Sequence, residues 1–291
     1  MPVTGVVPDW LFSTVAVATI FSVMFSIGLA TAPGEFRALA RHPGLMARGL
    51  FCVLVAVPAL AWIVARAFAL PRSAEIGIML MAISPGAPVA LRRSLGAGGD
   101  RAFAPALQIA VAALAVVSMP LSIAALNEYY AGTASIDPQV VGRQVFTAQF
   151  LPLLCGMLAR HFGSAGAAWL EPRLRRVAGV LLIVLLVLAL IDIWEVVIGA
   201  GMRVTLAIIT VTALAVTTGH LLGGPAPATR TATGISSAAR NPGLALLVAT
   251  LNAAAPAVQA TILSYLVIAS LTLIPYVFWR RRRAPPAPGG G

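Results

Sequence analysis

Long apolar runs recur along almost the whole chain, and they constrain its fold more than any other feature. About 20 apolar residues are enough to cross a bilayer as a helix. Nine runs of roughly this length occur, at 10–31, 44–70, 74–96, 103–126, 142–163, 175–199, 203–223, 229–252 and 256–279. Only 10% of the 291 residues are charged, whereas soluble domains carry about 25%. The sequence therefore predicts an all-α integral membrane protein with nine transmembrane helices in a lipid bilayer.

The connections between these runs are short, so we expect a single transmembrane domain over residues 1–279. Residues 280–291 begin with four arginines and continue with Pro and Gly, which predicts a basic, disordered tail. The first run has no basic segment before it, and no small-residue cleavage site clearly ends it. We therefore expect the first run to remain as a helix and not to be removed as a signal peptide.

The basic residues are all Arg, and they lie unevenly on the two sides of the predicted bundle. Fifteen fall in loops or at helix ends on one side, four on the other, and Arg240 falls inside a span. Because the richer side normally faces the cytoplasm, we expect a cytoplasmic C-terminus and an outside N-terminus, in a bacterial inner membrane. No basic face interleaved with aromatic residues accompanies the net charge of +11, so nucleic acid is not an expected partner.

Two of the runs are interrupted near their middles, by ISPGAPVAL at 83–91 and by ARNPGLALL at 239–247. Proline in a helix interior removes a hydrogen bond, but at the first helical position it is favourable. A Ser or Asn just before it can cap the new helix. We therefore predict Ser84 and Asn241 to be N-caps of half-helices. A single break of this kind can be an ordinary proline kink, whereas a matched pair favours a functional site.

The predicted half-helices begin at Pro85 and Pro242, and in the nine-span order they run in opposite directions. Interrupted helices in corresponding positions of two halves, here helices 1–4 and 5–9, are typical of inverted-repeat transporters. Their N-termini present free N–H groups and a positive dipole end, which favour anions. The predicted substrate-binding residues are those of the two breaks and two polar neighbours: Ser84, Pro85, Gly86, Gln108, Arg240, Asn241, Pro242 and Gly243.

These motifs resemble the bile acid:sodium symporter family. FSVMFSIGLATAPGEFRALARHP at 21–43 is similar to the family's opening Met-x-x-x-Gly-Leu, Phe-Arg and Pro. ISPGAPVAL is similar to its Cys-Pro-Gly-Gly break, and ARNPGLALL to its Gln-Asn-x-Gly-Leu-Ala. The resemblance covers residues 10–279. It implies a core bundle that contains the two crossed helices, a panel bundle that contains helices 1, 5 and 6, and transport of an organic anion in the crevice between them by alternating access.

The family's sodium ligands are mostly missing at the matching positions. The family has a Ser-Asn pair after the first break, a Ser and a Thr on the next helix, and an acidic residue and a Gln in the second broken helix. This chain has Ala90, Leu91, Ala104, Gln108, Ser236 and Arg240 there. Because sodium is a hard cation that prefers oxygen ligands and a carboxylate, we expect the usual sodium sites not to be used.

Arg240 is a charged residue at mid-membrane, which is costly and by default indicates a functional site. One interpretation is that it replaces the coupling cation and holds an anionic substrate; the other is an internal ion pair.

Asp192 and Glu195 are spaced to share one helix face and, with Ser236, are candidates for coupling or ion pairing. Either carboxyl group could pair with Arg240 or take up a proton when buried, and both could instead be solvated near the outer interface.

The expected function is secondary transport of a small organic anion, with no cofactor, no metal site, and a proton or Na⁺ as the coupling ion, if any. A proton-linked or auxin-efflux-type carrier that exports an organic acid is the alternative. The chain has no His-Glu-x-x-His motif and no aspartate-rich diphosphate motif, and its three His residues fall at helix ends or in loops, so an enzyme is not expected. Nothing in the sequence indicates an oligomeric state.

Overall fold

The computed structural model describes residues 9–31, 42–86, 88–130, 136–199, 201–252 and 254–283, and within them the chain is helical and has no β-strand. Two short π-helices, η1 and η2, interrupt α-helical runs. In chain order the elements are α1 (Asp9–Ala30), α3 (Pro43–Phe51), η1 (Cys52–Ala56), α4 (Val57–Ala67), α5 (Arg72–Ile83), α6 (Pro88–Gly96), α7 (Phe103–Tyr129), α8 (Pro138–Val145), η2 (Phe146–Phe150), α9 (Leu151–Phe162), α10 (Ser164–Gly199), α11 (Gly201–Leu222), α12 (Pro227–Ala238), α13 (Pro242–Leu251) and α14 (Pro256–Arg283).

Five helical segments among the described residues are long and apolar enough to cross a membrane. They are Pro43–Ala67, Phe103–Tyr129, Pro138–Phe162, Gly201–Leu222 and Pro256–Arg283. A shorter apolar stretch, Thr14–Ala30, lies in α1. The protein is therefore an integral membrane protein. Helices α5, α6, α12 and α13 are each 12 residues or shorter, too short to span alone, because the chain is interrupted where the sequence predicts a break.

Two helix ends differ from the sequence prediction. Helix α10 begins at Ser164, eleven residues before the predicted start at 175, because the polar segment before the apolar run also forms helix. The segment contains three alanines and an i,i+4 ion pair of 3.4 Å between Glu171 and Arg175, both of which favour helix. The predicted tail also begins later than expected, since α14 continues to Arg283, and residues 284–291 lie outside the described residues.

The extension of α14 is fixed by a buried arginine. Arg280 Nε donates a hydrogen bond to Thr231 Oγ1 at 2.7 Å, and its Nη2 donates to Pro227 O at 2.8 Å. Both acceptors belong to α12. Arginine near a helix C-terminus also interacts favourably with the helix dipole. The first of the predicted tail residues is therefore part of the packed structure.

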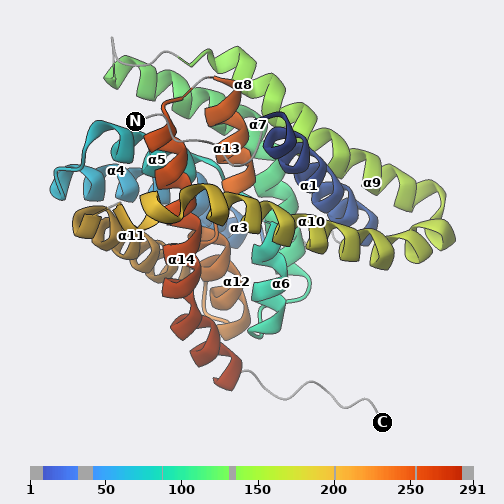
Figure 1. Ribbon diagram of the computed structural model, residues 1–291. Coiled ribbons are helices and arrows are strands. Elements are labelled where there is room, and N and C mark those ends of the chain that lie inside the picture. Colours follow the sequence, from blue (N-terminus) through green and yellow to red (C-terminus); the bar gives the residue numbers. More distant parts are fainter. Residues whose placement is uncertain are drawn as a thin grey trace.

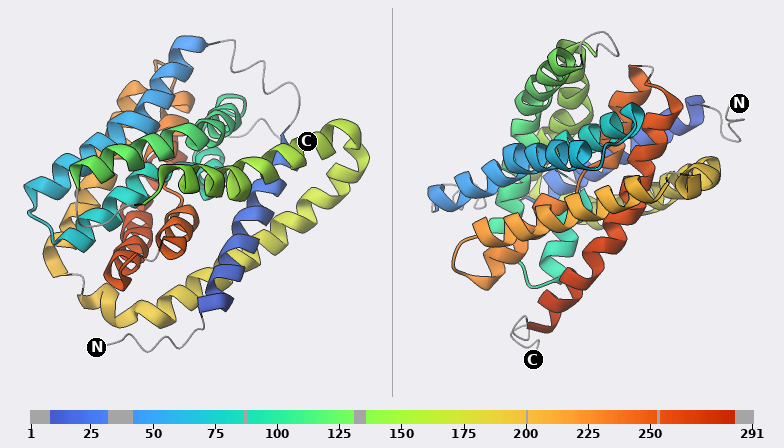
Figure 2. Two further views of the ribbon diagram at one scale, coloured as in Figure 1. Left: turned by 90° about the horizontal axis from the view of Figure 1, so that it is seen from above. Right: turned by 90° about the vertical axis from the view of Figure 1, so that its left-hand side faces the viewer.

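Helix α1 packs against α9 and α10, and Figure 1 shows it between these two helices at one side of the molecule. The three helices correspond to predicted spans 1, 5 and 6, which the family resemblance assigns to the panel. Helix α14 packs along α5, α11 and α13, and it also contacts α10. Figure 2 shows from above that α1 and α10 lie next to each other.

Two facing glycines allow the close contact between α1 and α9. A Cβ atom on Gly28 would collide with the backbone oxygen of Leu153 and lie 2.9 Å from Gly156 Cα. A Cβ atom on Gly156 would collide with Phe25 O and lie 2.9 Å from Leu29 N. Small residues are common at such helix contacts in membranes because they let the two backbones approach.

We predict that Gly156→Ala lowers the free energy of unfolding by about 1–3 kcal/mol, the usual cost of overpacking. Thermal unfolding in detergent measures this change. The control is Gly179→Ala in α10, where an added Cβ meets no atom within 4 Å and the higher helix propensity of Ala predicts a small gain. A similar loss in both variants would contradict the packing argument.

Candidate functional site

The two helix breaks contact each other in the interior of the protein. The backbone N–H of Asn241 donates a hydrogen bond of 2.9 Å to the backbone oxygen of Ser84. Both residues are buried. The two sequence motifs therefore lie at one place in the fold, where the α5–α6 and α12–α13 interruptions meet, and this place is called the crossing point below.

The second break has the predicted local structure. Helix α13 begins at Pro242, and the Asn241 side-chain oxygen accepts a hydrogen bond of 3.1 Å from Leu244 N. This geometry is that of an N-cap. Gly243 follows and is packed against Ile20 of α1, whose side chain would lie 3.1 Å from an added Cβ. The prediction that Asn241 caps a half-helix is confirmed.

The first break differs from the prediction, because Ser84 is not an N-cap and the half-helix does not begin at Pro85. Ser84 ends α5, and its hydroxyl donates to Leu80 O at 2.6 Å. Gly86, two residues after Ser84, has φ +83. This left-handed conformation interrupts a right-handed helix, and Gly adopts it easily. Helix α6 therefore begins only at Pro88, the second proline of the motif.

A cluster of buried amides surrounds this crossing point. Gln149 Oε1 accepts a hydrogen bond of 3.1 Å from Asn241 Nδ2, and Gln149 Nε2 donates to Ala112 O at 3.4 Å. A Cβ on Gly86 would lie 3.5 Å from Gln149 Nε2 and 3.6 Å from Gln108 Nε2, so both amides approach the first break. The sequence analysis singled out Gln108 but missed Gln149, although a Gln in the middle of an apolar run was a signal that could have identified it.

Arg240 lies beside the crossing point and is only 5% exposed. Its Nη1 donates two hydrogen bonds of 2.9 Å, one to Val53 O and one to Ala82 O. Its Nε and Nη2 are buried and have no hydrogen-bond partner among the described residues. Neither of the ion pairs found in the described part of the chain involves Arg240. The Nη1 of the guanidinium is thus bound by backbone acceptors, whereas its Nε and Nη2 have no hydrogen-bond partner among the described residues.

The acceptor at Val53 is free because of a neighbouring proline. In η1 the Val57 N–H bonds to Cys52 O, so it does not bond to Val53 O as it would in an α-helix. Pro58, the next possible donor in the π-helical pattern, has no N–H. The π-helix therefore leaves the Val53 carbonyl available to Arg240. Such single-turn π-helices often occur at functional sites.

Other predicted site residues are located as follows. Ser236 is buried in α12, one turn before the second break. Ala90 and Ala104, at two of the positions where the resemblance expects sodium ligands, are also buried. Asp192 and Glu195 lie in helix α10, but their side chains fall outside the part of the structure that is described. Their predicted roles in coupling or ion pairing remain predictions.

A cavity of about 700 Å³ reaches the crossing point. It is lined by α1, the ends of α5 and α6, the α12–α13 junction and one long stretch of α14, and most of the lining is aliphatic. Three arginines line it, Arg93, Arg240 and Arg281, and none of its described lining residues is Asp or Glu. An apolar cavity with a few fixed positive groups can bind an anion that carries an apolar part.

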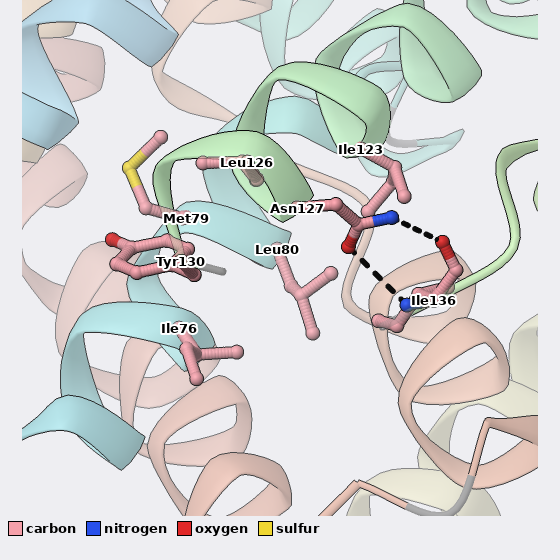
Figure 3. Close-up of a pocket in the computed structure, with 8 residues that line it drawn as sticks. All are labelled: Ile76, Met79, Leu80, Ile123, Leu126, Asn127, Tyr130 and Ile136. Carbon is pink, nitrogen blue, oxygen red and sulfur yellow. Dashed lines mark hydrogen bonds between the residues drawn. The ribbon is translucent and has the colours of Figure 1, made fainter. Parts of the chain in front are cut away.

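A second cavity lies between α5 and α7 and is much smaller, about 30 Å³ (Figure 3). The side chain of Asn127 closes one side of it by donating to Ile136 O at 2.6 Å and accepting from Ile136 N at 3.2 Å. The remaining lining is apolar apart from Tyr130. This volume holds about one water molecule, so this cavity is not a candidate substrate site.

The chain matches the model of the Sodium Bile acid symporter family over residues 17–200. This range contains the first break, whereas the second break, with Arg240 and Asn241, follows it. No curated protein matches the chain.

We predict that Gln149→Leu lowers the free energy of unfolding by about 1–3 kcal/mol, because it leaves the buried Asn241 amide without its acceptor. Chemical or thermal unfolding in detergent measures the loss. Gln144→Leu is the matched control, since Gln144 in α8 accepts a longer bond of 3.5 Å from Asn252 Nδ2 at a half-buried position. Equal losses in the two variants would argue against a special role for the buried amide cluster.

We predict that Pro58→Ala destabilises the protein, although replacing a proline inside a helix normally stabilises it. The new N–H would compete for the carbonyl that Arg240 uses and so weaken one bond of a buried charge. The control is Pro152→Ala, which changes the proline after η2, a π-helix whose carbonyls do not accept from Arg240. Unfolding temperatures compare the two variants, and a gain for Pro58→Ala would refute the argument.

Proposed function

Because this chain belongs to the Sodium Bile acid symporter family, we propose that it is a secondary transporter that carries a small organic anion across the membrane by alternating access. The large cavity supports an anionic cargo, since three arginines line it and none of its described lining residues is acidic. Its aliphatic walls suit the apolar part of such a cargo. Membership in a transporter family also supports the expectation that the chain is not an enzyme.

The observation that carries this proposal is the buried guanidinium of Arg240. Its Nη1 is bound by two backbone carbonyls, those of Val53 and Ala82, and carbonyl oxygens are also ligands that hard cations prefer. We propose that this fixed charge takes the place of a coupling sodium ion. Its Nε and Nη2, which have no partner among the described residues, are the donors that an anionic substrate would engage.

We propose that the membrane topology has nine spans in two inverted halves, with the N-terminus outside and the C-terminus in the cytoplasm of a bacterium. The direct bond between Asn241 and Ser84 supports this arrangement, because it joins corresponding positions of the two proposed halves. The four arginines at the end of α14 support a cytoplasmic C-terminus.

The test is uptake of labelled organic anions by proteoliposomes that contain the purified protein. Three conditions are compared: a sodium gradient, a proton gradient and no ion gradient. We expect uptake that does not respond to sodium. Sodium-driven accumulation would contradict the replacement of sodium by Arg240. Proton-driven uptake would favour the alternative of a proton-linked carrier, in which Asp192 or Glu195 takes up the proton.

We predict that Arg240→Gln weakens anion binding and uptake by about tenfold or more, since hydrogen bonds to charged groups contribute about 1.5–3 kcal/mol. Arg240→Lys keeps the charge but loses the planar fork, so it should retain part of the activity. The control is Arg230→Gln in α12, which removes an arginine that also bonds to a backbone carbonyl, Gly224 O, but does not line the cavity. Full anion binding by both Arg240 variants would exclude the fixed-charge proposal.

A further inference from the structure

A second positively charged group lines the cavity at some distance from the crossing point. Arg93 lies in α6, the half-helix that follows the first break, and it is half-buried. Its Nη2 donates a hydrogen bond of 3.5 Å to Ser270 Oγ of α14. The adjacent residue, Arg92, is exposed and does not line the cavity. Only one of the two neighbouring arginines therefore faces the interior space.

The separation of Arg93 and Arg240 can be compared with positions along helix α14. Tyr265 of α14 lines the cavity together with Arg240, whereas Ser270 contacts Arg93. These two positions on α14 are about 7.5 Å apart along the helix axis, at about 1.5 Å per residue. The residues of α14 that line the cavity between them are aliphatic. Arg240 and Arg93, two of the three arginines that line the cavity, are thus separated by an apolar stretch of α14.

The two charges have no acidic partner in the described lining of the cavity. Like charges in a low-dielectric space repel each other. An occupant with one anionic group would neutralise one arginine and leave the other unpaired. An occupant with two anionic groups at a suitable spacing would neutralise both of them.

We propose that Arg93, with the Ser270 hydroxyl, forms a second anion subsite, and that the substrate class is an organic dianion whose two charged groups are joined by an apolar spacer. One anionic group would bind at Arg240 and the crossing point, and the other at Arg93. This inference rests on the proposed function, because it assigns a substrate class to the same cavity.

The position of Arg281 fits this assignment. Arg281 also lines the cavity, near the end of α14, and it lies about 16 Å beyond Ser270 along the helix axis. It is exposed, so its charge is screened more than those of the other two. A positive group at the mouth of a cleft raises the local concentration of anions. Arg281 would therefore assist the entry of an anion and would not select among anions.

The experiment is calorimetric titration of the protein in nanodiscs with suberate and with its monomethyl ester. The two ligands have the same spacer and differ by one charge. Phosphatidylcholine is the only lipid, so that an anionic headgroup cannot occupy the subsite. We expect suberate to bind about tenfold more tightly or better, the value of one charge-assisted hydrogen bond. Adipate and sebacate, with their monoesters, test shorter and longer spacers.

Arg93→Gln should reduce suberate affinity to that of the monoester and leave the affinity of the monoester unchanged. Arg93→Lys should keep part of the preference for the dianion, because it keeps the charge. Arg92→Gln is the matched control, since it removes the same charge from the adjacent, exposed position, and it should alter neither affinity. A variant that unfolds would lose both ligands, so the difference between the two ligands reports on the subsite and not on folding.

Equal affinities of diacid and monoester for the unmodified protein would overturn the second subsite and leave the proposed transport of an anion standing. The same conclusion follows if Arg93→Gln weakens both ligands equally. If no diacid and no monoester binds, and proteoliposomes also take up none of the labelled anions, the proposed function fails together with this inference.

Discussion

The hydrogen bonds from Arg240 Nη1 to Val53 O and Ala82 O connect the second break with two segments that lie more than 150 residues away in the chain. A charge inside a membrane protein is tolerated only where other groups satisfy it, because transfer of an unpaired charge into an apolar medium is very costly. These two hydrogen bonds therefore hold the α12–α13 break against α5 and η1. This guanidinium also supplies one of the three positive charges that line the cavity.

Both π-helices of the described residues lie next to the same centre. Each π-helix is followed closely by a proline, Pro58 after η1 and Pro152 after η2. The first π-helix frees a carbonyl for Arg240, and the second carries Gln149, whose side chain bonds to Asn241. Non-helical backbone at membrane depth is tolerated only inside protein or next to water, which explains why these features are gathered in the interior.

Helix α13 is contacted at both ends by one continuous helical segment, α8–η2–α9. Gln149 of η2 bonds to its N-cap, Asn241, and Gln144 of α8 bonds to its C-cap, Asn252. The α8–η2–α9 segment also packs against α1. Hydrogen bonds between side-chain amides contribute only about 1 kcal/mol each to the free energy of unfolding. Both ends of α13 are therefore joined to the same continuous helical segment by weak side-chain contacts.

The sequence by itself determined five long apolar helices and the cap at Asn241, because hydrophobic length and the Asn-Pro pair act locally. It did not determine the start of α6, since two prolines of the first motif were possible and the left-handed conformation of Gly86 excluded Pro85. It also gave no sign that Arg240 uses carbonyls of η1 and α5, or that Gln149 reaches Asn241. Those contacts join distant segments, so only the tertiary packing of the helices could bring their atoms together.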